Sequence, residues 1–403
     1  SHNSGLRRIA GLASSSAPKL QALHLCNTSA VRLLRAVDFS LLPSAQLQTL
    51  DLSLNRLLDG NNNNSNNSDG FLRMVPFGAM KSLTSVLLAG LGLNVSTSAL
   101  AGMLASLKSL KELDLSENNY VQSTTTNLTL DGCLKSSTYV KVLRLRRVGL
   151  LDAHLGSFSE FRLLETVDLS QNGLRTVRQA TFNWNTNLKW ANLSRNQIEW
   201  IEPGSFGYVM RMELLDLSDN RLPAVRKDLF VRLVHLTRVH AERNAAMSLV
   251  DLCPFNVQYM RLAQSNFSQL GALLRCGQLL ELDLSGNRLR RVASDALAHT
   301  LLLGRLSLAA NAIETVEANA FYELKKLVWL DLSRNRLADP LEAEEEATLF
   351  AGLTNLAHLD LSGNRLSRVG PRLFASLVSL THLDLSENAL RRVDDYSFQR
   401  MHY

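Results

Sequence analysis

The chain has 403 residues, of which 46% are hydrophobic, and its formal net charge is +6. It contains no run of about 20 apolar residues, so we expect no transmembrane helix, and four cysteines are too few for a disulfide-rich scaffold. Arginine is spread over most of the chain, so the positive charge predicts a solvated basic surface more simply than an anion-binding site.

One phrase recurs along almost the whole sequence, most plainly from Leu380 to Phe398. Its spacing is L-x-x-L-x-L-x-x-N-x-L, followed by Val five residues after the Asn and Phe ten residues after it. A fixed period of this size indicates stacked units that share one continuous core. We count about fifteen units. Their key positions are Thr28, Asn55, Leu91, Asn118, Val148, Asn172, Asn196, Asn220, Asn244, Ser265, Asn287, Asn311, Asn335, Asn364 and Asn388.

The phrase predicts the local structure of each unit. L-x-L predicts a short parallel strand whose leucines point inward while the alternate residues point outward. The buried Asn is expected to satisfy backbone groups at the turn, so that successive units form a ladder of hydrogen bonds. Two further inward slots follow on the return leg. They are occupied by Val177, Ile201, Val225, Val292, Val316, Val369 and Val393, and by Phe182, Phe206, Phe230, Phe321, Phe374 and Phe398.

This combination of leucine, Asn, Val and Phe positions resembles the leucine-rich repeat family. The resemblance covers nearly the whole chain. It implies an α/β repeat fold, a horseshoe-shaped solenoid with a concave parallel β-sheet and a convex side of irregular, 3-10 and short helical segments. We therefore expect residues 1–403 to form one leucine-rich repeat domain.

In chain order, residues 1–19 form a partial unit, and the chain stops at Tyr403 in mid-unit, so we expect the natural protein to continue. Three insertions interrupt the period. Residues 60–70 are an Asn/Ser tract and residues 120–132 are rich in Thr, so both are expected to be surface loops. Residues 339–347 form an acidic insertion, after which the Phe slot resumes.

The cysteines suggest one disulfide. Cys253 and Cys276 lie in two shortened units around Ser265, 12 and 11 residues before the next key position. Adjacent coils would place them side by side, at a Cα separation that a disulfide allows. Two buried thiols in core positions are the alternative. For Cys26 and Cys133 the spacing predicts no partner.

Glycosylation motifs favour an extracellular location. Asn-x-Ser/Thr occurs at Asn27, Asn63, Asn66, Asn94, Asn127, Asn192 and Asn266. The repeat itself tends to produce Asn-Leu-Ser. However, Asn63, Asn66 and Asn127 lie in insertions, where that explanation fails.

Outward strand positions that depart from the usual Asp and Ser predict a binding surface on the concave side. The predicted partner-binding residues are Arg144, Arg146, Trp190, Arg238, His240, Glu242, Tyr259 and Arg261. Trp, Tyr and Arg are enriched at binding hot spots, so the partner is expected to be a protein. Tolerated variation on an exposed face is the alternative. A glycan on Asn192 would obstruct this face and move binding to a flank or to the convex side.

Two strands carry an alternating His-Asp-Ser trio. His358, Asp360 and Ser362 share one outward face, and the same trio recurs from His382. A Ser-His-Asp site needs an oxyanion hole and an Asp behind the His, which an open sheet does not offer. We therefore predict no enzyme, no cofactor and no metal site. A pH sensor or metal ligand at His358 and His382 is the alternative to a solvated surface.

The Asn-rich insertion, the shortened units with cysteines and the Ala- and Arg-rich composition are similar to insect proteins of the family. Similarity to the secreted leucine-rich repeat immune proteins of mosquitoes implies an extracellular protein of innate immunity. Such a protein binds complement-like factors or microbial surfaces. The cysteine-rich segment and coiled coil of that group are absent from the chain, and so are the cysteine-flanked caps of Toll-type ectodomains.

Other functions stay open at this stage. Similarity to Toll-type receptor ectodomains implies a receptor, and a cell-surface adhesion molecule has the same repeat. A binder of anionic glycan or nucleic acid would use the arginines at 144–147, and its affinity would fall steeply with salt. Homodimers or heterodimers are compatible with each function.

Overall fold

The structure is a computed structural model. It consists of two compact units, an N-terminal unit, Ser1–Met212, and a C-terminal unit, Glu213–Tyr403. We consider each unit by itself, and a single domain over 1–403 stays a prediction. The described residues are 19–26, 46–55, 75–92, 97–118, 139–151, 158–179, 181–223, 229–244, 256–270, 276–339 and 349–399. The partial first unit, the two loop insertions and the acidic insertion therefore lie outside the described residues, except for their boundary positions 19 and 339.

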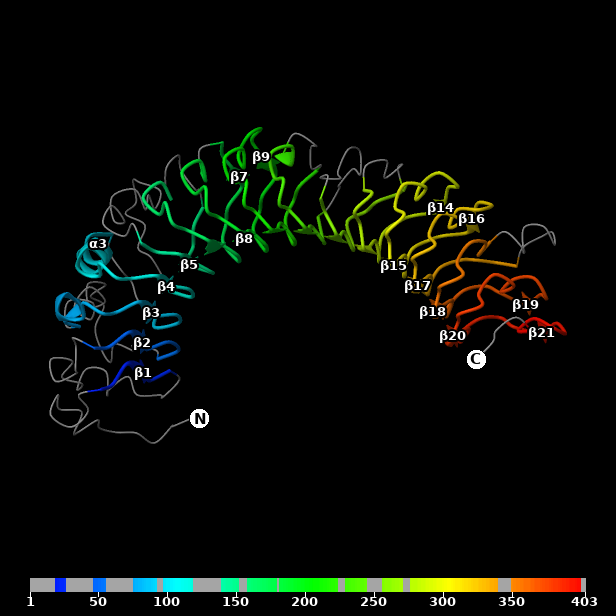
Figure 1. Cartoon of the computed structure of the whole chain (residues 1–403), viewed down its shortest axis with the longest axis horizontal. Coiled ribbons are helices and arrows are strands. Elements are labelled where there is room, and N and C mark those ends of the chain that lie inside the picture. Colours follow the sequence, from blue (N-terminus) through cyan, green and yellow to red (C-terminus); the bar gives the residue numbers. More distant parts are fainter. Residues whose placement is uncertain are drawn as a thin grey trace. The chain divides into compact units, whose positions relative to one another are not determined.

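In the N-terminal unit, the L-x-L segments form one sheet of short parallel strands (Figure 1). The middle residue of every strand is buried, as alternation along a strand requires. In sheet order the strands are β1 (Ala22–His24), β2 (Thr49–Asp51), β3 (Ser85–Leu87), β4 (Glu112–Asp114), β5 (Val142–Arg144), β6 (Thr166–Asp168) and β8 (Trp190–Asn192). The return legs hold the 3-10 helix η2 (Phe77–Ala79), the helix α3 (Thr97–Ser106) and the paired strands β7 (Thr176–Val177) and β9 (Trp200–Ile201).

The C-terminal unit repeats this plan. Its parallel sheet contains β10 (Leu214–Asp216), β11 (Arg238–His240), β12 (Tyr259–Arg261), β13 (Glu281–Asp283), β15 (Arg305–Ser307), β17 (Trp329–Asp331), β18 (His358–Asp360) and β20 (His382–Asp384). Its return legs hold two ribbons, β14 (Arg291–Val292) with β16 (Thr315–Val316) and β19 (Arg368–Val369) with β21 (Arg392–Val393). These small ribbons add regular structure to a side that we predicted to be irregular, 3-10 or helical.

The predicted Phe slot is confirmed by ring stacking, except that Phe398 in the last described coil is 42% exposed. Phe182 and Phe206 stack in the N-terminal unit with their ring centroids 5.7 Å apart. In the C-terminal unit Phe350 stacks on Phe321 at 6.5 Å and on Phe374 at 6.1 Å, so the slot does resume after the acidic insertion. Each such pair adds about 0.5–1.5 kcal/mol to the stabilisation that burial supplies.

The predicted Val slot is incomplete. Val177, Val292 and Val369 are buried, whereas Ile201 and Val316 are only half-buried and Val393 is 51% exposed. Val393 lies in the last described coil, where no described coil packs over it. Val316 lines a cavity on the return-leg side.

The Asn ladder is present in both units, and Asn172 shows its geometry. Its side-chain Nδ2 donates to the carbonyls of Leu145 and Leu169 at 2.8 and 2.9 Å. Its Oδ1 accepts from the amides of Val148 and Leu150 at 3.0 and 3.1 Å. One buried amide thus joins two successive coils, because both its donor and its acceptor reach the preceding unit.

The residue before each described key position has a left-handed backbone. Asp219 and Arg243 both have φ of 54° and Ala310 has φ of 52°, while Gly286 and Gly363 take the same place in their units. Residues other than glycine pay about 1 kcal/mol or more for this conformation. The Asn ladder therefore imposes a strained turn on most units.

The described cysteines differ in environment. Cys276 is buried and is not a free thiol, whereas Cys26 is free and exposed just after β1. Cys253 and Cys133 lie outside the described residues, so the pairing of Cys253 with Cys276 stays a prediction.

Within the part of the chain that the structure describes, no helix has the length and apolarity needed to cross a membrane.

Candidate functional site

Arg144, on β5 of the N-terminal unit, is held by a neighbouring carboxylate. Its guanidinium lies 2.6 Å from Glu112 on β4, and the other oxygen of Glu112 accepts a hydrogen bond from the Ser85 hydroxyl at 2.9 Å. Burial alone would raise the pKa of Glu112, but the hydrogen bonds from Arg144 and Ser85 outweigh it and lower that pKa. The charge of Arg144 is therefore largely compensated within the protein.

Arg146 is also engaged. In the orientation of the Gln171 amide that satisfies both of its ends, its oxygen accepts from Arg146 and Arg195, each at 3.0 Å. Arg146 lies 3.9 Å from Glu117 as well. Trp190 is half-buried on β8, and the strand β6 separates it from β5. Arg144, Arg146 and Trp190 thus share one sheet without forming a single cluster.

Two predicted glycosylation sites are described. The Oδ1 of Asn192 accepts from the Ser194 amide at 3.0 Å and from its hydroxyl at 2.7 Å, so this side chain caps the turn after β8. Asn266 is exposed and has a left-handed φ of 61°. Glycosylation of both stays a prediction, and the sites from Asn27 to Asn127 lie outside the described residues.

The C-terminal unit brings the remaining predicted residues together. Strand register places Arg238 opposite Tyr259 and His240 opposite Arg261 on the neighbouring strands β11 and β12. Arg238 and Arg261 are exposed, and Tyr259 is 38% exposed. None of these three side chains makes a polar contact with another described residue, so all three are available to a partner. We call Arg238, Tyr259 and Arg261 the β11–β12 patch.

Carboxylates lie beside the patch. The Nδ1 of His240 is 3.9 Å from the carboxylate of Asp216 on β10. Burial would raise the pKa of Asp216, but His240 and the Ser218 hydroxyl and amide outweigh it, so this pKa is lowered. Glu242 behaves in the opposite way, because burial raises its pKa and the charge of Asp216 adds to that effect. One oxygen of Glu242 is buried without a hydrogen-bond partner among the described residues.

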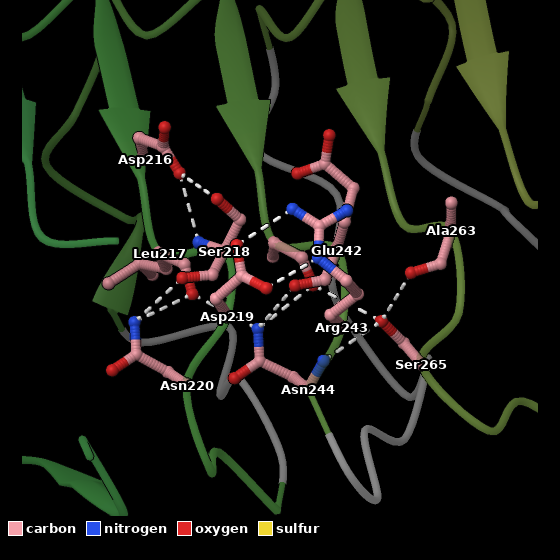
Figure 2. Close-up of polar contacts among 11 residues, drawn as sticks. Asp216, Leu217, Ser218, Asp219, Asn220, Glu242, Arg243, Asn244, Ala263 and Ser265 are labelled. Carbon is pink, nitrogen blue, oxygen red and sulfur yellow. Dashed lines mark hydrogen bonds and ion pairs between the residues drawn. The ribbon is translucent and has the colours of Figure 1, made fainter. Parts of the chain in front are cut away.

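Arg243 lies next to this cluster, three residues after the end of β11. Figure 2 shows its guanidinium against the carboxylate of Asp219, to which it donates at 2.5 and 2.7 Å. These hydrogen bonds raise the pKa of Arg243. Our sequence analysis missed this pair, although the two residues are 24 positions apart and occupy the same place in successive units.

Ser265 replaces the key Asn in the shortened unit after Asn244 (Figure 2). Its hydroxyl lies 3.2 and 3.1 Å from the carbonyls of Ala241 and Ala263, and its amide donates to the side chain of Asn287 at 2.9 Å. A hydroxyl thus takes over part of the Asn ladder, so β11, β12 and β13 remain paired through the irregular region.

The His-Asp-Ser trios have a structural arrangement. The carboxylates of Asp360 and Asp384 each accept a hydrogen bond at 2.8 Å, from the backbone amides of Ser362 and Ser386 respectively. The rings of His358 and His382 stack on each other with centroids 4.2 Å apart. Over the described ranges, no group of three or more His, Cys, Asp or Glu could hold a metal ion.

One aromatic contact on the same sheet was not predicted. Arg305 on β15 lies over the indole ring of Trp329 on β17, with its guanidinium carbon 4.8 Å from the ring centroid. The strand register that sets Arg305 opposite Trp329 produces this cation–π contact. The sequence signal for this contact is that Arg305 and Trp329 occupy the same strand position in successive units.

The sequence profile of the leucine-rich repeat family matches residues 162–222, 186–245, 256–337 and 346–402, which together make up more than half of the chain. The chain belongs to the leucine-rich repeat family. Proteins of this family are binding scaffolds, and the fold class predicted from the sequence is confirmed. At the level of sequence, no curated relative matches the chain.

Solved leucine-rich repeat structures share the fold at low identity. A leucine-rich repeat protein of Leptospira interrogans is 21% identical, with a TM-score of 0.68 and coverage of 94% of each chain. Toll in the Toll–Spätzle complex of Drosophila is 19% identical, with a TM-score of 0.64. The match covers 79% of this chain and 46% of the Toll chain. TLR13 in complex with single-stranded RNA is 19% identical, with a TM-score of 0.61. The match covers 90% of this chain and 53% of the TLR13 chain. This leucine-rich repeat protein therefore spans about half the length of these two receptors.

Proposed function

We propose that this leucine-rich repeat protein is an extracellular, non-enzymatic scaffold that recognises a protein partner in innate immunity. The β11–β12 patch carries the proposal. Its two exposed arginines and its tyrosine are of the types that dominate binding energy at protein interfaces, and they have no competing partner among the described residues. In contrast, Arg144 is compensated by Glu112, and Arg146 is engaged by Gln171.

The carboxylates beside the patch support this function. Asp216 and Glu242 lie on the β10 and β11 side of the patch, next to His240. Unpaired cations next to half-buried carboxylates on the same sheet present both signs of charge to a partner. Such mixed surfaces favour specificity and a defined orientation of the partner.

The structural neighbours are consistent with recognition of macromolecules. Toll was solved with Spätzle, and the leucine-rich repeat ectodomain of the receptor kinase GASSHO1/SCHENGEN3 from Arabidopsis thaliana was solved with Casparian strip integrity factor 2. We extend from these neighbours to an extracellular protein, secreted or part of a surface receptor. The seven predicted glycosylation motifs of the sequence support that location. Within this proposal, a mosquito-type secreted immune protein is the narrower hypothesis, and a receptor or adhesion ectodomain is its rival.

A binder of anionic glycan or nucleic acid is the second candidate. Arg147 supports it, because this exposed residue has a left-handed φ of 52° and makes no polar side-chain contact with the described residues. An anionic ligand held by Arg147 would lose affinity steeply as salt rises, since binding releases counterions. A protein partner docked on the β11–β12 patch would show a weaker dependence on salt.

The test is affinity capture from the extracellular fluid of the source organism. We would compare the wild type with the triple variant Arg238→Ala, Tyr259→Ala, Arg261→Ala. The matched control variant is Arg290→Ala, Arg372→Ala, Tyr396→Ala, which removes the same residue types from exposed return-leg positions. We expect a protein that the wild type and the control retain and the patch variant loses. Equal retention by all three proteins would contradict the proposal.

A further inference from the structure

A cavity of about 530 Å³ opens on the return-leg side of the C-terminal unit. Apolar side chains form most of its wall, including Val316, Ala338, Phe350, Leu366 and Leu373. The volume lies within the range of small-molecule sites, which are mostly apolar and concave. Protein interiors are otherwise close-packed, so a cavity of this size among core residues requires an explanation.

The repeat explains where the cavity forms. The unit from Asn335 to Asn364 is 29 residues long, whereas the two units directly before it are 24 residues long. The ribbon β14–β16 ends before this unit and the ribbon β19–β21 begins after it. Five residues after Asn335, where seven of the fifteen units have Val or Ile, the sequence has Pro340. Val316, at the end of β16, is half-buried, whereas Val292 at the equivalent place in β14 is fully buried.

Three carboxylates contribute to the cavity wall, and the described lining contains no Lys or Arg. They are Glu314, Glu317 and Asp339. Each already has a partner. Glu314 lies 3.3 Å from Arg336, and Glu317 lies 3.2 Å from Arg291 and accepts from the Ser294 amide at 3.0 Å. Asp339 accepts from the Ser367 amide at 2.8 Å.

These contacts keep two of the carboxylates charged. The hydrogen bond from Ser294 lowers the pKa of Glu317. Burial would raise the pKa of Asp339, but the hydrogen bonds from Ser367 and Arg368 outweigh it and lower that pKa. A ligand in this cavity would thus meet carboxylates and an apolar wall, while the arginines that pair with Glu314 and Glu317 lie outside the described lining.

We propose that this cavity binds an uncharged, apolar small molecule, whose hydrocarbon part packs against Phe350, Leu366 and Leu373. An anionic head group would lie against the carboxylates of Glu317 and Asp339, which disfavours it relative to an uncharged one. The proposal concerns the opposite side of the repeat from the β11–β12 patch and does not depend on it.

The experiment is a fluorescence titration of the whole chain with the neutral probe N-phenyl-1-naphthylamine. We expect saturable binding with one site, and we expect dodecan-1-ol to displace the probe. Dodecanoate should compete at least tenfold more weakly, because its carboxylate faces the acidic residues of the cavity. Absence of saturable probe binding, or equal competition by the alcohol and the carboxylate, would overturn the proposal.

Two variants locate the site. Ala338→Trp fills the cavity and should weaken probe binding at least tenfold, while Leu301→Trp, at a residue that is 51% exposed and outside the lining, should leave it unchanged. Glu314→Lys is at an exposed position and tests the mouth without disturbing the core. It should strengthen competition by dodecanoate severalfold. Unchanged probe binding in Ala338→Trp, or unchanged dodecanoate competition in Glu314→Lys, would contradict the assigned position.

Discussion

Arg243 donates two hydrogen bonds to the carboxylate of Asp219, and both residues have a left-handed φ of 54°. The shared backbone conformation follows from their shared place in successive units, immediately before Asn220 and Asn244. It directs the two side chains toward each other just after the carboxyl ends of β10 and β11 (Figure 2). A turn geometry imposed by the buried Asn thus positions charged groups beside the proposed binding surface.

The first prediction concerns this ion pair. A double-mutant cycle with Asp219→Ala and Arg243→Ala should give a coupling free energy of about 0.5–1 kcal/mol at low salt, because two parallel hydrogen bonds hold a partly exposed pair. The pair of Glu314 with Arg336 is the control, since it has one contact at 3.3 Å and both side chains are half exposed. Urea unfolding measures both couplings. Equal values would contradict the special role of the bidentate geometry.

The second prediction concerns the Asn ladder. Asn335→Ala should lower the free energy of unfolding by about 2–4 kcal/mol, because it leaves buried carbonyls and the Ile313 amide without partners. Asn388→Ala should cost less than half as much. The Asn388 side chain makes equivalent hydrogen bonds, but it is only partly buried, so water can replace them. Equal losses in urea unfolding would show that burial does not set the cost.

The third prediction concerns the pH dependence of stability. Burial raises the pKa of Glu242, so the folded protein keeps this proton above pH 4.5, where the unfolded chain begins to release it. Stability from this group is therefore complete below pH 4.5 and is lost as pH rises through the raised pKa. Glu242→Gln should be more stable than the wild type at pH 7, and the difference should disappear below pH 4.5.

The control for this variant is Glu323→Gln, which removes one negative charge from an exposed position. Thermal unfolding at pH 4 and pH 7 provides the comparison. A Glu242→Gln variant that is less stable than the wild type at pH 7 would mean that the ionised carboxylate stabilises the fold.

The fourth prediction concerns backbone strain. Ala310 has a left-handed φ of 52°, at the place that Gly286 and Gly363 occupy in other units. Ala310→Gly should therefore stabilise the protein by about 0.5–1 kcal/mol, since glycine adopts this conformation without a steric cost. Its neighbour Ala309 is not in this region, so Ala309→Gly should destabilise by a similar amount. The same sign for both variants would contradict the assignment of strain.

The sequence predicted the repeat, the parallel strands and the Asn ladder because these features are local and recur at a fixed spacing. Asn172 and its equivalents, and the Phe slot at Phe182 and Phe350, are determined by inward positions that each unit must fill. The Val slot failed at Ile201 and Val316, which are half-buried, because the burial of this position depends on the coils beside it and not on the residue itself.

The binding surface was less predictable. Sequence analysis placed Arg144 and Arg261 in the same class, since both are outward arginines. Glu112 compensates Arg144 across an irregular interval of 32 residues, whereas Arg261 has no polar partner among the described residues. Pairing between outward side chains depends on strand register and rotamers, and the core pattern does not restrict it. That difference narrows the predicted surface to the β11–β12 patch.

The most direct test of this account is the affinity of the captured partner for the wild type and for the two triple variants, measured by titration at two salt concentrations. We expect Arg238→Ala, Tyr259→Ala, Arg261→Ala to weaken binding at least tenfold, with the return-leg control within twofold of the wild type and only a modest dependence on salt. An unchanged dissociation constant in the patch variant would contradict recognition through the β11–β12 patch.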